Sequence, residues 1–321
     1  MIGGRVLFLG IEGKALTREE AAILKRTRPV GIVLVTRNIG EETELRSLVE
    51  ALRTIVPRAI FGLDAEGGRV DRLKRIVGPS PAASELALQP PSAARTAGRQ
   101  IGQSLRKFGF DLDFAPVVDL DHGRVGNALD QRTFGTTPRA VVARARAFAD
   151  GLARAGIGSC VKHFPGLGDA PADTHESFAR IEQSKSRLER ELTPFTELFP
   201  STQAVMVSHA IYPGWDPDER PATLSRKICG ELLRGRLRYR GALLSDDLEM
   251  GALREQGTLP EIAAQSLAAG CDGLLFCRRI DEAPAIAAAL GRRSLRPRLE
   301  EASRRLERLG RALAKMKRAA A

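Results

Sequence analysis

The sequence is poor in several residues that mark specialised classes of protein. Its 321 residues include only one tryptophan, two tyrosines and four cysteines. The cysteines, at positions 160, 229, 271 and 277, form no CxxC pair, so neither a zinc ribbon nor a disulfide framework is indicated. No apolar run approaches the ~20 residues that a membrane-spanning helix needs. The remaining composition, 43% hydrophobic and 28% charged, is typical of a globular chain with a sizeable core.

The N-terminus also lacks the pattern of a signal peptide. The apolar stretch that begins at Ile2 turns polar at Glu12, and no small-residue cleavage site follows. We therefore expect a cytoplasmic protein with no membrane partner.

Positive charge is in excess, with 50 lysines and arginines against 39 acidic residues and a net charge of +11. A basic protein can bind nucleic acid, but here bases and acids are interleaved, and 5% aromatic residues leave few stacking platforms. The dense basic stretch at 292–318 is typical of the solvated face of a terminal helix. An acidic small substrate suits the charge as well as a polyanion does, and we expect no nucleic-acid partner.

Short apolar runs alternate with longer segments of helical periodicity. Each run is bounded by glycine, proline or a polar residue, as in strands buried on both faces. The predicted strands are 6–9, 31–35, 60–63, 112–115, 158–161, 204–207, 242–244 and 273–276. The predicted helices are 19–25, 42–55, 94–108, 140–155, 188–198, 226–237, 262–269, 285–290 and 299–316.

Eight strand–helix units predict an α/β protein with a single (β/α)8 TIM-type barrel. We expect one catalytic domain over 1–321, with a basic C-terminal helix at about 296–318. An open doubly wound sheet is the alternative, but the glycine fingerprints that cradle phosphate in such sheets are missing.

Polar residues stand directly after the predicted strands, where a barrel of this type carries its active site. They include three of the four histidines and several carboxylates: Asp64, Asp119, Lys162, His163, Ser208, His209, Asp246 and Asp247, with Asp173 and His175 just beyond. A single aspartate after a strand is more often a helix N-cap, and we interpret Asp119 and Asp247 in that way. His209 is interpreted as a hydrogen-bonded structural residue.

Asp173 and His175 form the pair for which a catalytic role is favoured. Residues i and i+2 of an extended loop project to one side, so the carboxylate can hold the imidazole and raise its pKa. A proton donor near neutral pH results. Beside a carboxylate nucleophile, such a donor points to glycoside cleavage. No HxH, HExxH or GxSxG pattern occurs, so we expect no metal, no cofactor and no serine nucleophile.

Several sequence strings together resemble those of family 3 glycoside hydrolases, specifically the single-domain bacterial β-N-acetylhexosaminidases of peptidoglycan recycling. The strings are DAEGGRV at 64–70, FAPVVD at 114–119, RTFG at 132–135, KHFPG at 162–166, DTH at 173–175 and SDDL at 245–248. They occur in the family's order. The chain departs from the family's usual pattern at Leu167, where a histidine is usual, at Ala65 and Asp71, where glutamine is common, and at Glu249, where a small residue is frequent.

The resemblance implies a role for each matching residue. Asp246 is the expected nucleophile, and His175 the expected acid/base, oriented by Asp173. The groups expected to grip the sugar are Asp64, Arg72, Arg132, Lys162 and His163. Position along the strand does not by itself choose between Asp246 and Asp247.

The activity that the resemblance implies is that of a retaining exo-β-N-acetylglucosaminidase. It would release terminal GlcNAc from GlcNAc-1,6-anhydro-muropeptides through a covalent glycosyl-aspartate. Transfer of the sugar to phosphate and a β-glucosidase activity are the alternatives within the family. A basic, non-catalytic binding protein is a distant alternative. We expect a monomer.

Overall fold

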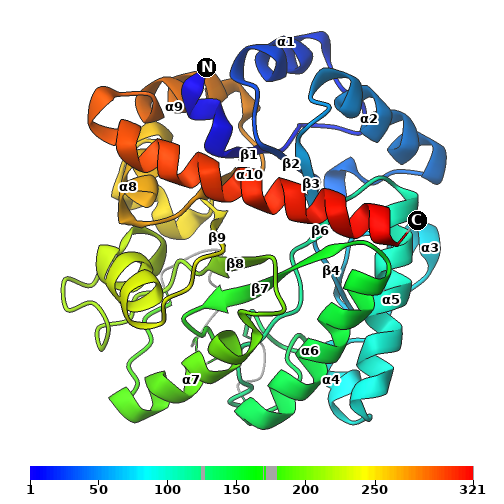
Figure 1. Cartoon of the computed structure of the whole chain (residues 1–321), viewed down its shortest axis with the longest axis vertical. Coiled ribbons are helices and arrows are strands. Elements are labelled where there is room, and N and C mark those ends of the chain that lie inside the picture. Colours follow the sequence, from blue (N-terminus) through cyan, green and yellow to red (C-terminus); the bar gives the residue numbers. More distant parts are fainter. Residues whose placement is uncertain (124–126, 169, 171–178, 321) are drawn as a thin grey trace.

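The computed structural model describes residues 1–123, 127–168, 170 and 179–320. Within these residues, eight parallel strands close into a barrel that helices surround (Figure 1). Around the barrel the strands follow in the order β1(Leu7–Leu9), β10(Gly273–Phe276), β9(Ala242–Asp247), β8(Ala204–Val207), β7(Gly158–Phe164), β6(Leu112–Asp113), β3(Ile60–Leu63) and β2(Gly31–Val33). The predicted (β/α)8 barrel is therefore confirmed.

Strand boundaries differ most from the prediction where polar residues follow apolar ones. From the apolar pattern, β7 and β9 are expected to end at residues 161 and 244. In the structure, β7 continues through Lys162 and His163, and β9 continues through Asp246 and Asp247. A buried strand can include these residues because neighbouring elements supply partners for their charges, as described below. By contrast β2 ends at Val33 rather than at residue 35, and β6 at Asp113 rather than at residue 115.

All nine predicted helical segments have a counterpart. They are α1(Arg18–Thr27), α2(Glu42–Ile55), α5(Pro91–Lys107), α6(Pro138–Arg154), α7(Lys185–Leu198), the π-helix η4(Lys227–Arg236), α8(Leu259–Ala269), α9(Ala283–Leu290) and α10(Arg296–Ala319). Their starts are set by local chemistry. In α1, for example, Thr17 and Glu20 form a reciprocal capping box that satisfies two backbone N–H groups of the first turn.

A hairpin above β3 was not predicted from the sequence. It consists of β4(Ala65–Gly67) and β5(Val70–Asp71), and short helices α3(Lys74–Val77) and α4(Ala83–Ala87) follow it. Gly67 has φ +90°, and a Cβ atom at this position would lie 2.2 Å from the carbonyl oxygen of Pro81. Glycine is therefore required for the hairpin to fold back over the barrel mouth.

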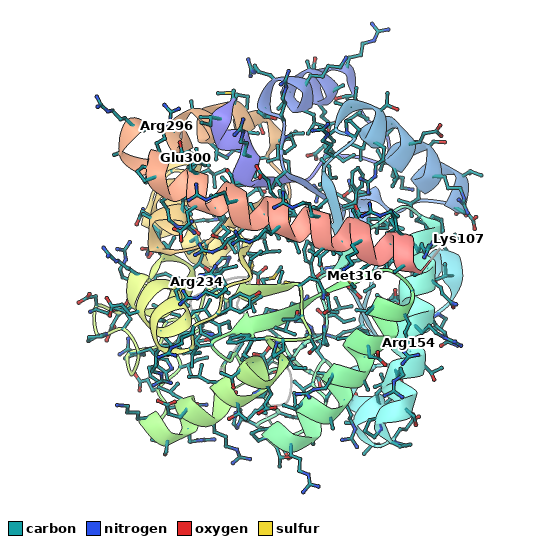
Figure 2. All side chains as sticks on the ribbon, in the orientation of Figure 1. Lys107, Arg154, Arg234, Arg296, Glu300 and Met316 are labelled. Carbon is teal, nitrogen blue, oxygen red and sulfur yellow. The ribbon has the colours of Figure 1, made fainter. Side chains whose placement is uncertain are left out.

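The amino-terminal ends of the strands are closed by α10, which crosses in front of the barrel in Figure 1. Asp272, just before β10, is completely buried and accepts hydrogen bonds from Arg298 and Arg305 of α10 and from Arg234 of η4. Outside this buried network, Arg296 and Glu300 pair at 3.3 Å on the exposed start of α10 (Figure 2). Ion pairs thus stabilise the fold at the amino-terminal end of the barrel, whereas barrels of this type carry their active site at the carboxyl-terminal end.

Within the described residues, no helix combines the length and the apolar composition that crossing a bilayer requires.

Candidate active site

Lys162 is the centre of a charged cluster at the carboxyl-terminal end of the barrel. Its side chain comes from β7 and is buried, and its Nζ lies 2.7 Å from Asp64 Oδ1 and 2.6 Å from Glu66 Oε1. Arg132 holds Glu66 with both Nε and Nη2, each at 2.7 Å. Arg72 Nη2 lies 3.6 Å from Asp64 Oδ2. Two carboxylates and three cations thus meet here, and we call these five residues the Lys162 cluster.

Charge pairing keeps the buried members of the cluster ionised. Burial tends to raise the pKa of Glu66, but Arg132 and Lys162 lower it more, so its pKa lies well below the usual value. Burial likewise tends to lower the pKa of Lys162, but the adjacent carboxylates of Asp64 and Glu66 raise it above the usual value. The cluster therefore presents fixed, fully charged donors and acceptors, which are strong partners for hydroxyl and amide groups of a ligand.

His163 is held by Asp119, which the sequence analysis interpreted as a helix cap. That interpretation is wrong. Asp119 Oδ2 lies 2.7 Å from His163 Nδ1 and accepts the backbone N–H of His163, while its Oδ1 accepts the N–H of Leu167 at 2.7 Å. The carboxylate is fully buried and links β7 to the start of the following loop. Because Nδ1 is engaged, Nε2 is the ring nitrogen that remains able to meet a ligand.

Asp246 and Asp247 end β9 in different electrostatic environments. Burial tends to raise the pKa of Asp246, but His209, His163 and Lys162 offset this effect and leave the pKa below its usual value. Asp246 Oδ1 also accepts the backbone N–H of Asp247 at 2.8 Å. The pKa of Asp247, in contrast, is raised to about 7, first by burial and then by the nearby Glu249 carboxylate. At neutral pH, Asp246 is ionised whereas Asp247 is protonated in a large fraction of molecules, so Asp246 is the better nucleophile of the two.

Asp247 does not cap a helix either, contrary to the interpretation from sequence. Its Oδ1 accepts the N–H groups of Glu249 and Cys277, both at 3.2 Å, and so joins the ends of β9 and β10. The next helical segment, the 3-10 helix η5(Gly251–Gln256), has Met250 at its N-cap position. His209 does have the hydrogen-bonded environment that was expected, with Thr223 at one ring nitrogen and Asp247 at the other.

Comparison with known families decides the class of this protein. The model of the glycosyl hydrolase family 3 N-terminal domain matches residues 5–309. The chain belongs to glycoside hydrolase family 3. Like the family, it is a glycoside hydrolase.

Curated relatives of this family 3 chain carry the name beta-hexosaminidase. The protein of Alkalilimnicola ehrlichii is 38% identical over 290 residues, which cover 87% of this chain and 82% of the relative. The protein of Pseudomonas aeruginosa is 37% identical over 294 residues, covering 91% of this chain and 88% of the relative.

Solved structures agree with this assignment. Native NagZ from Neisseria gonorrhoeae has a TM-score of 0.80 at 30% identity, over 98% of this chain and 97% of that one. A family 3 β-N-acetylglucosaminidase from a Paenibacillus species has a TM-score of 0.90 at 30% identity. The alignment covers 98% of this chain but only 62% of that longer protein.

The family 3 barrel thus brings together most of the residues that the sequence singled out. Asp64, Arg72, Arg132 and Lys162 meet in one cluster. His163 on β7 and Asp246 on β9 lie at the same end of the barrel, with β8 between these two strands. Asp173 and His175 lie outside the described residues. Among the described residues, no three His, Cys, Asp or Glu side chains are grouped so as to hold a metal ion.

Glu66 was missed by the sequence analysis, although it lies within the string at 64–70. It joins Arg132 to Lys162, and its side chain is almost completely buried. Asp113 was missed as well. It is fully buried below the hairpin, where its Oδ1 accepts the N–H of Ala65 and burial raises its pKa well above the usual value. Two features of the sequence could have indicated them: Asp113 interrupts the apolar run at 112–115, and Glu66 follows the strand at 60–63 by three residues.

Proposed function

We propose that this family 3 enzyme is a retaining exo-β-N-acetylglucosaminidase. In the proposal it acts in the cytoplasm and removes terminal GlcNAc from GlcNAc-1,6-anhydro-muropeptides during cell-wall recycling. The observation that carries the proposal is the ionised Asp246 on the same barrel end as the Lys162 cluster. A charged nucleophile beside a rigid set of sugar-binding donors and acceptors is what displacement at an anomeric carbon requires.

The proposed reaction has two steps. Asp246 attacks the anomeric carbon and forms a glycosyl ester, while His175 gives its proton to the leaving oxygen. In the second step His175 takes a proton from water, which attacks the same carbon and releases Asp246 as a carboxylate. Asp173 is proposed to orient His175 and to favour its protonated form. Overall, one molecule of water hydrolyses one glycosidic bond, and the anomeric configuration is retained.

The sugar is proposed to be gripped by Asp64, Arg72, Arg132, Lys162 and His163. The first four belong to the Lys162 cluster, and Glu66 forms ion pairs with two of them, Arg132 and Lys162. Support for an N-acetylhexosamine as substrate comes from the relatives, which are named beta-hexosaminidases. The net charge of +11 is compatible with carboxylate groups on a muropeptide.

Turnover of nitrophenyl β-GlcNAc tests this function, with nitrophenyl β-glucoside as the substrate control. We expect turnover of the first and little of the second; the reverse preference would identify a β-glucosidase. NMR of the first product should show the β-anomer, whereas initial release of the α-anomer would contradict retention. A reaction that runs only after phosphate is added, and yields a sugar phosphate, would replace hydrolysis by phosphorolysis.

Two neighbouring variants test the assignment of the nucleophile. Asp246→Asn should reduce kcat by roughly a thousandfold or more. Asp247→Asn is the matched control, since it changes the adjacent carboxyl to an amide but keeps the oxygen that accepts from Glu249 and Cys277. Should Asp247→Asn be the inactive variant of the two, Asp246 is not the nucleophile. His175→Ala should retain more activity on the nitrophenyl substrate, whose leaving group needs little protonation, than on a natural disaccharide.

A further inference from the structure

His209 lies in the barrel mouth beside the proposed nucleophile but has no role in the proposed reaction. It follows β8 and is 3% exposed. Its Nε2 lies 2.9 Å from the carbonyl oxygen of Asp247, and its Nδ1 lies 2.7 Å from the Thr223 hydroxyl in the 3-10 helix η3(Ala222–Leu224). Both ring nitrogens are therefore engaged, one of them with the residue next to Asp246.

The partners determine where protons can sit on this ring. A carbonyl oxygen only accepts hydrogen bonds, so Nε2 must carry a hydrogen and donate it to Asp247. The Thr223 hydroxyl has one hydrogen and two neighbours, His209 Nδ1 and the carbonyl oxygen of Ser208 at 2.7 Å. If the hydroxyl donates to Nδ1, the ring is neutral. If the hydroxyl donates to Ser208, Nδ1 must donate, and the ring is a cation.

Both proton states fit the same heavy-atom positions. In the neutral state the Ser208 carbonyl still accepts the backbone N–H of Thr223 at 3.2 Å, so no buried acceptor loses its only partner. In the cationic state every donor on the ring has an acceptor. His209 can thus gain a proton by a rotation of one hydroxyl group, without moving the nucleophile.

The main chain of Asp247 forms hydrogen bonds with both His209 and Asp246. The N–H group of Asp247 donates to Asp246 Oδ1 at 2.8 Å, while the carbonyl group of Asp247 accepts from His209 and from the Met250 N–H at 3.1 Å. The residue between His209 and the nucleophile is therefore held at both of its main-chain polar groups. Loss of the His209 bond would loosen the 247–248 peptide, which adjoins the 246–247 peptide whose N–H binds the attacking carboxylate.

We propose that His209 is a positioning residue for Asp246, neutral at neutral pH, which becomes a cation in acid and keeps Asp246 ionised there. The inference rests on the proposed function, in which Asp246 must be a carboxylate to attack. Among the described residues, the ionisable residues that face His209 are Asp246 and Asp247 from β9 and His163 from β7.

The electrostatic environment of His209 and Asp246 supports a ring that is neutral at neutral pH and protonated in acid. Burial lowers the pKa of His209 below its usual value, although Asp246 and the Asp247 carbonyl oppose this effect, so the ring is neutral near pH 7. The pKa of Asp246 lies below its own usual value, with His209 as the first group that lowers it against burial. Because only a protonated ring carries the positive charge that lowers the pKa of Asp246, the proposal requires His209 to take up its proton before Asp246 does.

The experiment compares His209→Gln with His209→Leu, using nitrophenyl β-GlcNAc from low to high pH. Glutamine keeps an N–H donor for the Asp247 carbonyl but cannot become a cation, and leucine supplies neither. At pH 7 we expect His209→Leu to lower kcat by roughly tenfold or more and His209→Gln by less than about threefold, with KM little changed in both. Equal losses of kcat in the two variants, or a change confined to KM, would overturn the positioning role.

The pH profile tests the charge. In His209→Gln the acid limb of kcat/KM, which reports the free enzyme's nucleophile, should move to higher pH, while the basic limb stays in place. An unmoved acid limb would overturn the proposed cation. Thr223→Ser and Thr223→Val give a second pair in case His209→Leu does not fold. Serine keeps the hydroxyl and should keep kcat, whereas valine should lower it; equal values would also count against the proposal.

Failure of this inference can be told apart from failure of the proposed function. If the wild-type enzyme does not turn over nitrophenyl β-GlcNAc, the proposed function fails. If the wild type is active and retaining, and the His209 variants behave alike, only the role of His209 is overturned. Thermal unfolding of each variant shows whether a lost rate reflects a lost fold.

Discussion

Lys162 and Asp64 lie 98 residues apart in the sequence and meet in a 2.7 Å ion pair at the carboxyl-terminal end of the barrel. Lys162 lies in β7, and Asp64 directly follows β3. The short β6 lies between these strands in the barrel. The ion pair thus connects β7 to the segment after β3 across β6, and it holds these two segments together at the proposed sugar-binding site.

The two-point contact between Arg132 and Glu66 predicts a strong effect of a conservative change. Arg132→Lys keeps the charge but cannot hold both carboxylate oxygens, because lysine is a point donor rather than a planar fork. We expect KM for nitrophenyl β-GlcNAc to rise by roughly tenfold, with a smaller change in kcat, since the group binds the sugar in both the ground state and the transition state.

Arg236→Lys is the matched control for this prediction. Arg236 also holds a glutamate, Glu189, with two hydrogen bonds of 2.6 Å, but this pair is exposed on the outside of the barrel. Steady-state kinetics should show wild-type KM for Arg236→Lys. Equal effects of the two substitutions would mean that the Lys162 cluster does not bind the substrate.

Asp119 is predicted to act through His163 rather than as a structural cap. In Asp119→Asn, one carboxylate oxygen that now accepts from His163 becomes an amide nitrogen, so the hold on the imidazole ring weakens. We expect kcat/KM to fall by roughly tenfold or more, since such supporting carboxylates set the orientation and tautomer of a histidine.

Asp216→Asn separates this effect from the general cost of changing a buried aspartate. Asp216 is 2% exposed and accepts from Asp218 N–H and Ser225 Oγ. It belongs to the loop after β8, and it has no hydrogen bond or ion pair with those proposed site residues that the structure describes. Its variant should lose stability in urea unfolding yet keep its kcat/KM. The prediction for Asp119 is wrong if both variants lose activity in proportion to their loss of stability.

Asp119 and Glu66 also show why part of the site could not be predicted from the sequence. Apolar runs and their spacing predicted all eight strands, because strands buried on both faces must be apolar. The same pattern says nothing about which distant groups a strand-end carboxylate meets. Asp119 accepts a backbone hydrogen bond from His163 in β7, and Glu66 reaches Lys162 and Arg132 only because a hairpin folds over the mouth. These partners depend on tertiary contacts over 44 and 66 residues.

The roles of single residues were predictable to different degrees. Family motifs placed Asp246 first among the two adjacent carboxyl groups, and the structure adds a physical difference between them, because their pKa values shift in opposite directions. Residues 171–178 lie outside the described part of the chain, so the roles of Asp173 and His175 stay predictions that rest on the sequence alone.

The raised pKa of Asp247 predicts how stability depends on pH. Its folded-state pKa of about 7 exceeds 3.8, the usual value for an aspartate, so the folded protein binds this proton more tightly than the unfolded chain does. This group therefore destabilises the fold progressively as the pH rises from about 4 to about 7, by roughly 1.4 kcal/mol for each unit of difference. Asp247→Asn removes the titration, so its free energy of unfolding relative to the wild type should increase over that interval.

Urea unfolding of the two proteins at pH 4, 5.5, 7 and 8 measures this difference. It should grow between pH 4 and 7 and then level off, because the group is ionised in both states above its folded pKa. A difference that stays constant over the whole range would show that Asp247 is ionised in the folded protein at every pH tested, and its raised pKa would be refuted.

The central claim is that Asp246 forms a covalent bond to the sugar. The most direct measurement uses 5-fluoro-β-N-acetylglucosaminyl fluoride, a donor whose good leaving group favours formation of the glycosyl-enzyme and whose ring fluorine slows its hydrolysis. Intact mass spectrometry followed by peptide mapping should find one added sugar on the peptide that contains residues 245–248, with fragmentation placing it on Asp246. A sugar attached to Asp247 or to another residue, or continued turnover with no adduct, would contradict the account.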